Sequence, residues 1–433
     1  MCYNKTKNLM GDFFMSKKFK VAVVGCGNRG LTYASEMLAK GDVYEIVALC
    51  DTNPKQLEKM KKVLPLKNVS EFNHPDEFFK EKRADIVIIA SSDREHVPQA
   101  LRALELGYDI LLEKPISDSR EELRALVDAQ KKYGGKIVIC HVLRYAPGFV
   151  KCEELLKSGV IGRLYAIDAS ENVVYWHWVQ AFVRGQFANM ELSHPAILAK
   201  CCHDLDILTS YADSECETIS SVGELGFFKP ENAPGGAAER CFECKHKDVC
   251  PYSAKRIYID AWHEKGEPEF AWPFNKVSLV KPLTEENLME GIKTNDFGRC
   301  AFKQKVDVVD HQMVQMTFKN GIKASLKMMF AAERGRRITL YGTYGEIVLD
   351  ERTDEICVMP FGKEKQIIKI SDLIEVDSGH GGGDTKIIDS LYEMLISAED
   401  GKTSLAKSVE SHLMGIAAEE SRKSGGVPIR VHK

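Results

Sequence analysis

The sequence predicts an α/β plus α+β protein, in which a doubly wound parallel sheet precedes a larger domain built on an open antiparallel sheet. Apolar strand patterns alternate with amphipathic helix patterns over the first third of the chain, which is typical of a parallel sheet covered on both faces. Between residues 305 and 330, two alternating strand patterns flank Asn320-Gly321, a hairpin signal that favours antiparallel pairing.

The length of 433 residues suffices for two or three domains with a sizeable core. We expect an N-terminal extension at 1–17, the parallel-sheet domain at 18–145 and the α+β domain at 146–433. A polar, cysteine-rich insertion is expected within the second domain, at about 230–302.

Composition excludes several classes of protein. A net charge of -4 gives no basic surface for nucleic acid, and no apolar run is long enough to span a membrane. The first residues lack the apolar core of a secretory signal, and Met15 is an alternative start. The odd count of 13 cysteines argues against a simple disulfide framework. We therefore expect a cytoplasmic protein without nucleic-acid or membrane partners.

A glycine-rich turn gives the first functional signal. An apolar strand at 19–24 runs into Gly25-x-Gly27-x-x-Gly30, a helix pattern follows, and the next strand ends at Asp51. The first glycine suits a tight turn, the second lets backbone N–H groups approach a pyrophosphate, and the third permits close helix–strand packing. This context predicts a dinucleotide-binding Rossmann domain, the alternative being a glycine-rich surface turn.

Asp51 also bears on the choice of cofactor. A carboxylate at this position accepts hydrogen bonds from ribose hydroxyls and crowds a 2′-phosphate, and the adjacent CDTNP tip offers no arginine. We therefore expect NAD rather than NADP. The further candidate cofactor contacts lie in the glycine-rich turn and at the ends of the following strands, and they are Asn28, Arg29, Ser91, His96, Glu113 and Lys114.

The segment LLEKP, residues 111–115, ends a predicted strand at the sheet edge where ligands of such sheets bind. Glu113 and Lys114 point to opposite faces if the strand persists. Lys114 could then hydrogen-bond a substrate hydroxyl that loses its proton. Taken alone, this segment favours the alternative of a surface charge pair.

The predicted helix AILAKCCHDLDIL, residues 196–208, combines apolar content with several polar groups. Lys200, His203, Asp204 and Ile207 follow helical spacing and share one face. Lysine and aspartate are rarely buried unless they are paired. The helix is therefore either a solvated element with an ordinary charge pair or the wall of an active site.

Together, the glycine-rich turn, Asp51, Glu113-Lys114-Pro115 and a downstream His203-x-x-Asp206 resemble the Gfo/Idh/MocA family of glucose–fructose oxidoreductase and inositol dehydrogenase. The resemblance begins at about Lys18 and covers nearly the whole chain. It implies a Rossmann domain followed by a substrate-binding and oligomerisation domain, NAD(P)-dependent redox chemistry on sugars, cyclitols or polyols, and a homodimer or homotetramer. It also implies catalytic roles for Lys114 and His203.

One position departs from the family pattern Asp-x-x-x-His, because Ala199 lies four residues before His203. Lys200 lies beside the missing aspartate. We expect its ammonium to favour neutral imidazole and a developing alkoxide, which makes Lys200 a third catalytic candidate.

Further candidate substrate contacts lie in the second domain. His177 and Arg184 sit among aromatic residues after a predicted strand at 163–176, which suits a carbohydrate pocket, although a packed aromatic cluster is the alternative. His380 lies in the loop SGHGGGD, which is either part of the site or a flexible linker. With these, the substrate set comprises Lys114, His177, Arg184, Lys200, His203, Asp204 and His380.

The insertion contains Cys241-x2-Cys244-x5-Cys250, a spacing that lets two or three thiolates reach one ion. We expect a structural zinc with Cys300 as fourth ligand, His246 or Cys216 being the alternatives. An iron–sulfur cluster would also accept four cysteines, and free thiols in a mobile insertion are the remaining interpretation.

The expected activity is hydride transfer between a secondary hydroxyl of a sugar, cyclitol or glycoside and the nicotinamide of NAD. Lys114 would polarise the hydroxyl, and His203, tuned by Lys200, would carry the proton. One alternative is redox-assisted glycoside cleavage with tightly bound, recycled NAD. Another is a non-catalytic protein that senses a dinucleotide.

Overall fold

The computed structural model describes residues 18–332, 335–375, 379–397 and 399–432, so the predicted extension at 1–17 lies outside the described residues. The N-terminal lobe is built on a six-stranded parallel sheet in the order β3-β2-β1-β4-β5-β6. Most of its strands are short apolar runs, as expected for a sheet buried on both faces, whereas the edge strand Ser70–Phe72 is largely exposed. They are β1 (Phe19–Val24), β2 (Tyr44–Cys50), β3 (Ser70–Phe72), β4 (Ile86–Ile89), β5 (Asp109–Leu112) and β6 (Ile137–Ile139).

Helices connect these strands, which confirms the predicted strand–helix alternation and the doubly wound parallel sheet. Three of the helices begin at side-chain caps: Asn53 accepts from Lys55 N–H, His74 from Asp76 N–H, and Ser119 from Glu122 N–H. The helices are α1 (Asn28–Ala39), α2 (Pro54–Val63), α3 (Pro75–Phe78), α4 (His96–Glu105) and α5 (Arg120–Tyr133).

The strand predicted at 136–145 is shorter in the structure. β6 pairs with Ile110–Leu112 of β5 and ends at Ile139, because β5 itself ends at Leu112 and offers no backbone partner beyond it. The chain then forms a short helical turn over Val142–Tyr145. This early ending leaves His141 and Arg144 at the carboxyl edge of the sheet.

The C-terminal lobe contains a nine-stranded sheet in the order β14-β13-β12-β11-β7-β10-β9-β8-β15. Its pairings are antiparallel except that between β7 and β10, which is parallel, so the predicted open antiparallel sheet is confirmed as a mixed, mostly antiparallel one. The strands are β7 (Leu164–Val174), β8 (Cys216–Glu224), β9 (His311–Phe318), β10 (Lys323–Ala332), β11 (Gly335–Gly342), β12 (Gly345–Asp350), β13 (Glu355–Pro360), β14 (Gln366–Lys369) and β15 (Ile429–Arg430).

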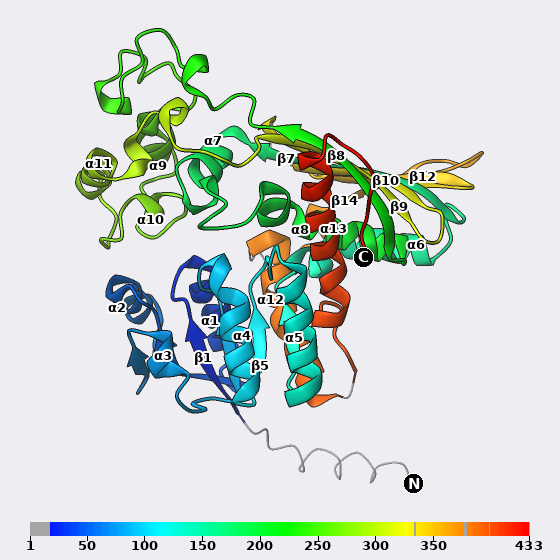
Figure 1. Cartoon of the computed structure of the whole chain (residues 1–433), viewed down its shortest axis with the longest axis horizontal. Coiled ribbons are helices and arrows are strands. Elements are labelled where there is room, and N and C mark those ends of the chain that lie inside the picture. Colours follow the sequence, from blue (N-terminus) through cyan, green and yellow to red (C-terminus); the bar gives the residue numbers. More distant parts are fainter. Residues whose placement is uncertain (1–17, 333–334, 376–378, 398, 433) are drawn as a thin grey trace, which may run out of the picture.

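Four longer helices belong to the second part of the chain, and two of them join the lobes (Figure 1). They are α6 (Pro147–Lys157), α8 (Ala196–Ala212), α12 (Gly383–Ile396) and α13 (Leu405–Lys423). The chain returns to the N-terminal lobe in α12, whose Ile387, Ile388 and Leu391 pack into the same apolar cluster as Tyr33 of α1. α13 lies against α8, β8 and α5.

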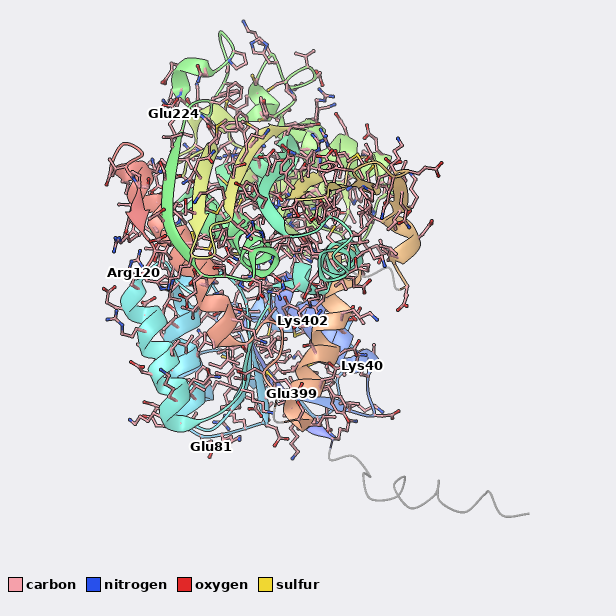
Figure 2. The ribbon with its side chains drawn as sticks, turned by 90° about the vertical axis from the view of Figure 1, so that its right-hand side faces the viewer. Lys40, Glu81, Arg120, Glu224, Glu399 and Lys402 are labelled. Carbon is pink, nitrogen blue, oxygen red and sulfur yellow. The ribbon has the colours of Figure 1, made fainter. Side chains whose placement is uncertain are left out.

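The contact between α5 and the C-terminus is polar. Arg120, labelled in Figure 2 at the start of α5, donates to Val431 O over 2.6 Å and pairs with Glu420 at 3.4 Å. Within the described ranges, no helix combines the length and apolar character needed to cross a membrane.

The insertion follows β8 and lies beyond the end of the large sheet (Figure 1). It contains the short helices α9 (Ala261–Glu264) and α10 (Phe274–Val277), and the longer α11 (Glu285–Thr294). A backbone bridge between Arg240 and Arg299 brings its early and late parts together.

Candidate active site

The glycine-rich turn is packed tightly on one side and open on the other. Gly25 has a φ of +91°, and a side chain there would collide with the Ala90 carbonyl. A Cβ at Gly30 would collide with the Gly25 carbonyl, whereas a Cβ at Gly27 would meet nothing within 4 Å. Gly27 immediately precedes α1, so backbone N–H groups at this helix end are accessible to a pyrophosphate.

Asp51 lies directly after β2 and fixes this turn. Its Oδ2 accepts a hydrogen bond from Cys26 N–H over 2.8 Å, and its Oδ1 accepts one from Asn53 N–H over 2.8 Å. The carboxylate is therefore held at the β2 tip, where the ribose of a dinucleotide is expected.

Arg29, a predicted cofactor contact, turns toward carboxylates instead. Its Nε donates to Glu113 Oε1 over 2.7 Å, and its Nη1 and Nη2 donate to Asp384 over 3.0 and 2.8 Å. Tyr33 completes the network by donating to Glu113 Oε1 over 2.7 Å. Arg29 thus joins α1, the end of β5 and the start of α12.

The two carboxylates of this network stay ionised despite burial. Burial alone would raise the pKa of Glu113, but Arg29 and Lys114 outweigh it and lower that pKa. Burial likewise opposes ionisation of Asp384, whereas hydrogen bonds from His380 and Arg29 hold its pKa well below the usual range.

Ser91 and His96, also predicted cofactor contacts, lie at the carboxyl edge of the sheet next to the turn. His96 is buried, with Nδ1 at 2.7 Å from Pro115 O and Nε2 at 3.3 Å from Ser91 O. Its ring therefore braces the backbone beside Lys114. Ser91 Oγ donates to Gln99.

Lys114 and His203 come together although 88 residues separate them in the sequence. The Lys114 backbone N–H donates to Glu113 Oε2 over 2.8 Å, and its Nζ donates to Ala199 O on the first turn of α8 over 3.3 Å. This contact directs the ammonium toward the helix that carries His203.

His203 is buried, and within the described residues its Nδ1 has no hydrogen-bond partner. The rings of His141 and His380 lie 5.7 and 6.1 Å away, centroid to centroid. Burial lowers the pKa of His203 well below its usual value, and the positive charge of Lys114 lowers it further. The imidazole is therefore neutral near pH 7 and able to accept a proton.

Lys200 and Asp204 belong to a different set of contacts, on the side of α8 that faces the large sheet. Lys200 Nζ pairs with Glu171 Oε1 of β7 at 3.1 Å. Arg336 of β11 pairs with Glu171 at 2.7 Å and with Asp204 at 2.8 Å. The polar face of this helix is thus a buried, paired charge network. Lys114 is the charged group that lowers the pKa of His203 most, and the tuning role expected of Lys200 stays a prediction.

His380 and Asp206 frame the site from two sides. His380 precedes α12, and its Nδ1 lies 3.2 Å from Asp384 Oδ1, so the segment 379–384 holds this ring beside His203. Asp206 is buried 3.6 Å from Arg144, and burial raises its pKa to about 7, although Arg144 opposes the shift.

Arg184 contacts the insertion, although we expected it at the substrate. Its Nε donates to Arg299 O over 2.9 Å, and its Nη2 donates to Tyr252 O over 2.8 Å and to Cys241 Sγ over 3.3 Å. No contact that the structure gives it is with Lys114 or His203. His177, on α7 (Tyr175–Trp178), packs against the Trp272 ring at 4.8 Å.

The predicted zinc or iron–sulfur site is not supported. Over the part of the chain that the structure describes, no three His, Cys, Asp or Glu side chains are positioned to hold one metal ion. One small cavity is nevertheless bordered by the four predicted ligands and by His246, whereas Cys216 is buried in β8 and does not line it. The cavity-lining cysteines are Cys241, Cys244, Cys250 and Cys300, and all four are free thiols.

Sequence reasoning missed several residues of the site. Glu171, Arg336 and His141 are brought to α8 only by the folding of distant strands, and no local pattern marks them. Asp384 had a signal, because it closes the glycine-rich segment that drew attention to His380.

A parallel sheet with an open glycine turn, and a lysine and a neutral histidine beside it, define an NAD-binding oxidoreductase. The profile of the oxidoreductase family with an NAD-binding Rossmann fold (GFO_IDH_MocA) matches residues 19–141, and that of the family's C-terminal alpha/beta domain matches 153–431. The chain belongs to the Gfo/Idh/MocA family. An NAD(P)-dependent oxidoreductase acting on CH–OH groups, as predicted, is thereby confirmed.

Individual relatives agree with this assignment. The putative oxidoreductase YteT of Bacillus subtilis is 26% identical over 390 residues, which cover 84% of this chain and 87% of YteT. An inositol 2-dehydrogenase of Rubrobacter xylanophilus is 25% identical over 210 residues, 47% of this chain and 55% of that enzyme. The structure of a levoglucosan dehydrogenase in complex with NADH and levoglucosan superposes with a TM-score of 0.69 at 16% identity, covering 96% of this chain and all of that one, which supports the fold alone.

The Arg29 network gives a stability prediction. Asp384→Asn removes a buried carboxylate bonded to Arg29 and should lower the free energy of unfolding at pH 7 by about 1–3 kcal/mol. Because the pKa of Asp384 is depressed in the folded state, its contribution is present above the unfolded pKa of about 4 and is lost as pH falls. The variant should therefore also show a shallower loss of stability on acidification.

Urea unfolding at pH 7 and pH 3.5 measures both effects. Asp389→Asn is the matched control, because it lies on the same helix in an exposed pair with Lys40 and should change stability by less than about 1 kcal/mol. Equal stability of Asp384→Asn and wild type at pH 7 would contradict the role of the network.

Proposed function

We propose that the protein oxidises a secondary hydroxyl of a sugar, cyclitol or glycoside with NAD. The observation that carries this proposal is the meeting of the Lys114 ammonium with the buried, neutral imidazole of His203. They meet beside the open glycine turn, at the edge of the parallel sheet where such sheets bind ligands.

The chemical roles follow from the protonation states. Lys114 has three N–H donors and one contact to Ala199 O, so it can donate to a substrate hydroxyl and stabilise the developing alkoxide. His203 then accepts the hydroxyl proton. Bound NAD supplies the acceptor for the hydride that leaves the same carbon.

The fit to NAD rests on the turn. Gly27 leaves room for a close approach of the pyrophosphate to the start of α1, and Asp51 stands where the ribose is expected. The substrate class is supported by the relatives, among them an inositol 2-dehydrogenase. The half-buried aromatic cluster of Trp176, His177 and Trp272 suits the apolar face of a sugar ring.

Redox-assisted glycoside cleavage with recycled NAD is the second candidate. It is favoured by the contact between the insertion and the start of α1, where Asn275 and Asn28 lie 3.3 Å apart, because a covered dinucleotide would be released slowly. Nicotinamide absorbance distinguishes the two: net NADH accumulates in the first case, and turnover proceeds without it in the second. A homodimer or homotetramer and a cytoplasmic location stay predictions of the sequence.

Removal of either catalytic candidate should abolish most turnover. We expect Lys114→Ala and His203→Ala each to lower kcat by roughly 10²–10⁴-fold, the usual contribution of a general acid–base group, while NAD affinity and fold persist. Steady-state kinetics and thermal unfolding measure this. Cys201→Ala is the matched control, because it is equally buried on α8 and should keep kcat even if Tm falls. Normal turnover in His203→Ala would refute the assignment.

Lys200 allows a sharper test of its part in the reaction. Lys200→Ala should lower Tm, because it removes the ion pair with Glu171, and should leave the pH–rate profile nearly unchanged. If Lys200 instead tunes His203, its removal should lower kcat and shift the apparent pKa of the profile upward. Measuring Tm and the pH profile on the same variant decides between these roles.

A structural metal ion at the four cysteines stays a prediction. Their thiols border one cavity, and Arg184 Nη2 donates to Cys241 Sγ over 3.3 Å. If an ion is bound, protein purified without chelators should contain about one zinc per chain, and Cys244→Ser should lose it. Cys357→Ser, outside the insertion, should retain it. Elemental analysis that finds no metal in wild type would end this proposal.

A further inference from the structure

Three lysines from distant parts of the chain lie near one another: Lys59 interacts with both Lys276 and Lys281, and Asp51 acts on the first two. Lys59 lies on α2, Lys276 on α10 and Lys281 in the segment that follows α10. Lys59 is only 4% exposed, and the contact found for its Nζ is a long one of 3.4 Å to Asn28 Oδ1. Lys276 and Lys281 are half-buried.

The charges of these lysines influence one another. Burial lowers the pKa of Lys59, and Lys276 lowers it further. Burial also lowers the pKa of Lys281, to about 8, with a second contribution from Lys59. For Lys276 burial is again the main cause, and Asp51 opposes it. Three ammonium groups therefore lie in one region that is partly shielded from water.

Asp51 is the carboxylate that acts on Lys59 and Lys276, and it is already engaged. Its two oxygens accept the N–H groups of Cys26 and Asn53. One carboxylate cannot neutralise three cations. A buried charge without a counter-charge is costly. Binding of an anion would therefore stabilise this cluster of ammonium groups.

The position of the cluster identifies the class of that anion. Asn28 is the first residue of α1, and its side-chain amide exchanges contacts of 3.3 Å with the amide of Asn275 on α10. Figure 1 shows α10 of the insertion facing the start of α1 and α2. Lys59, which contacts Asn28, and the segment that carries Lys276 therefore lie next to the helix end that is open above Gly27, where phosphate groups bind.

We propose that Lys59, Lys276 and Lys281 form a phosphate-binding site through which the insertion closes over the bound dinucleotide. The inference rests on the proposed dinucleotide-dependent function and adds a role for the insertion in it. The anion is a phosphoryl group, either of the pyrophosphate or at the ribose 2′ position of NADP. Lysine suits both, because its ammonium binds phosphate as a point charge.

Calorimetric titration of the full chain with NAD and with NADP tests this proposal. We expect Lys276→Met and Lys281→Met, which keep the apolar stems, each to weaken dinucleotide binding about tenfold or more. Lys293→Met on α11 is the matched control, because Lys293 is an exposed lysine of the same insertion. The affinity of Lys293→Met for both dinucleotides should equal that of the wild type.

Comparing the loss of affinity for NAD with the loss of affinity for NADP identifies which phosphate the lysines bind. Equal weakening of NAD and NADP indicates the pyrophosphate, whereas selective weakening of NADP indicates the 2′-phosphate. Wild-type affinity for both dinucleotides in the two lysine variants, with unchanged Tm, would overturn the inference and leave the proposed function intact. Failure of the wild type to bind either dinucleotide would overturn the proposed function itself.

Discussion

The guanidinium of Arg29 is the contact on which the site geometry depends. It bonds to Glu113 and Asp384, which lie in separate segments, and each carboxylate orients a candidate site residue. Glu113 holds the backbone of Lys114, and Asp384 holds His380 beside His203. A bidentate arginine fixes direction as well as distance, so the N-terminal turn, the end of β5 and the start of α12 are held in one arrangement.

A second constraint is that α8 carries charged side chains in a buried position. Its sheet-facing polar groups neutralise one another across strands, since Lys200 pairs with Glu171 and Asp204 pairs with Arg336. His203 therefore keeps a neutral ring whose pKa is set by burial and by Lys114. A helix that looks too polar for a core is buried because its charges are matched by partners on β7 and β11.

The parts of this molecule that could be predicted are those encoded by local pattern. Alternating strands and helices gave the parallel sheet, and the glycine spacing located the turn beside Asp51. The resemblance of short motifs connected Lys114 with His203. Partners across the sheet had no such signal: Glu171 and Arg336 are 165 residues apart, and only the pairing of β7 with β11 brings them together. Arg184 shows a related ambiguity, because aromatic neighbours suggest a pocket equally well when they pack against an insertion.

The choice of cofactor also depends on residues that are distant in the sequence and that no local pattern marks. From the sequence, only the tip after β2 could be considered, and it contains an aspartate without a nearby arginine. In the folded chain Lys276 lies close enough to interact with Asp51, and Lys281 close enough to interact with Lys59, although both are more than 200 residues later in the sequence. The insertion that carries them is tied to the second domain by Arg184, which bonds to Arg299 O and Tyr252 O. The electrostatic environment of the dinucleotide site is therefore a property of both lobes, and a change in the insertion can alter cofactor binding without touching the glycine-rich turn.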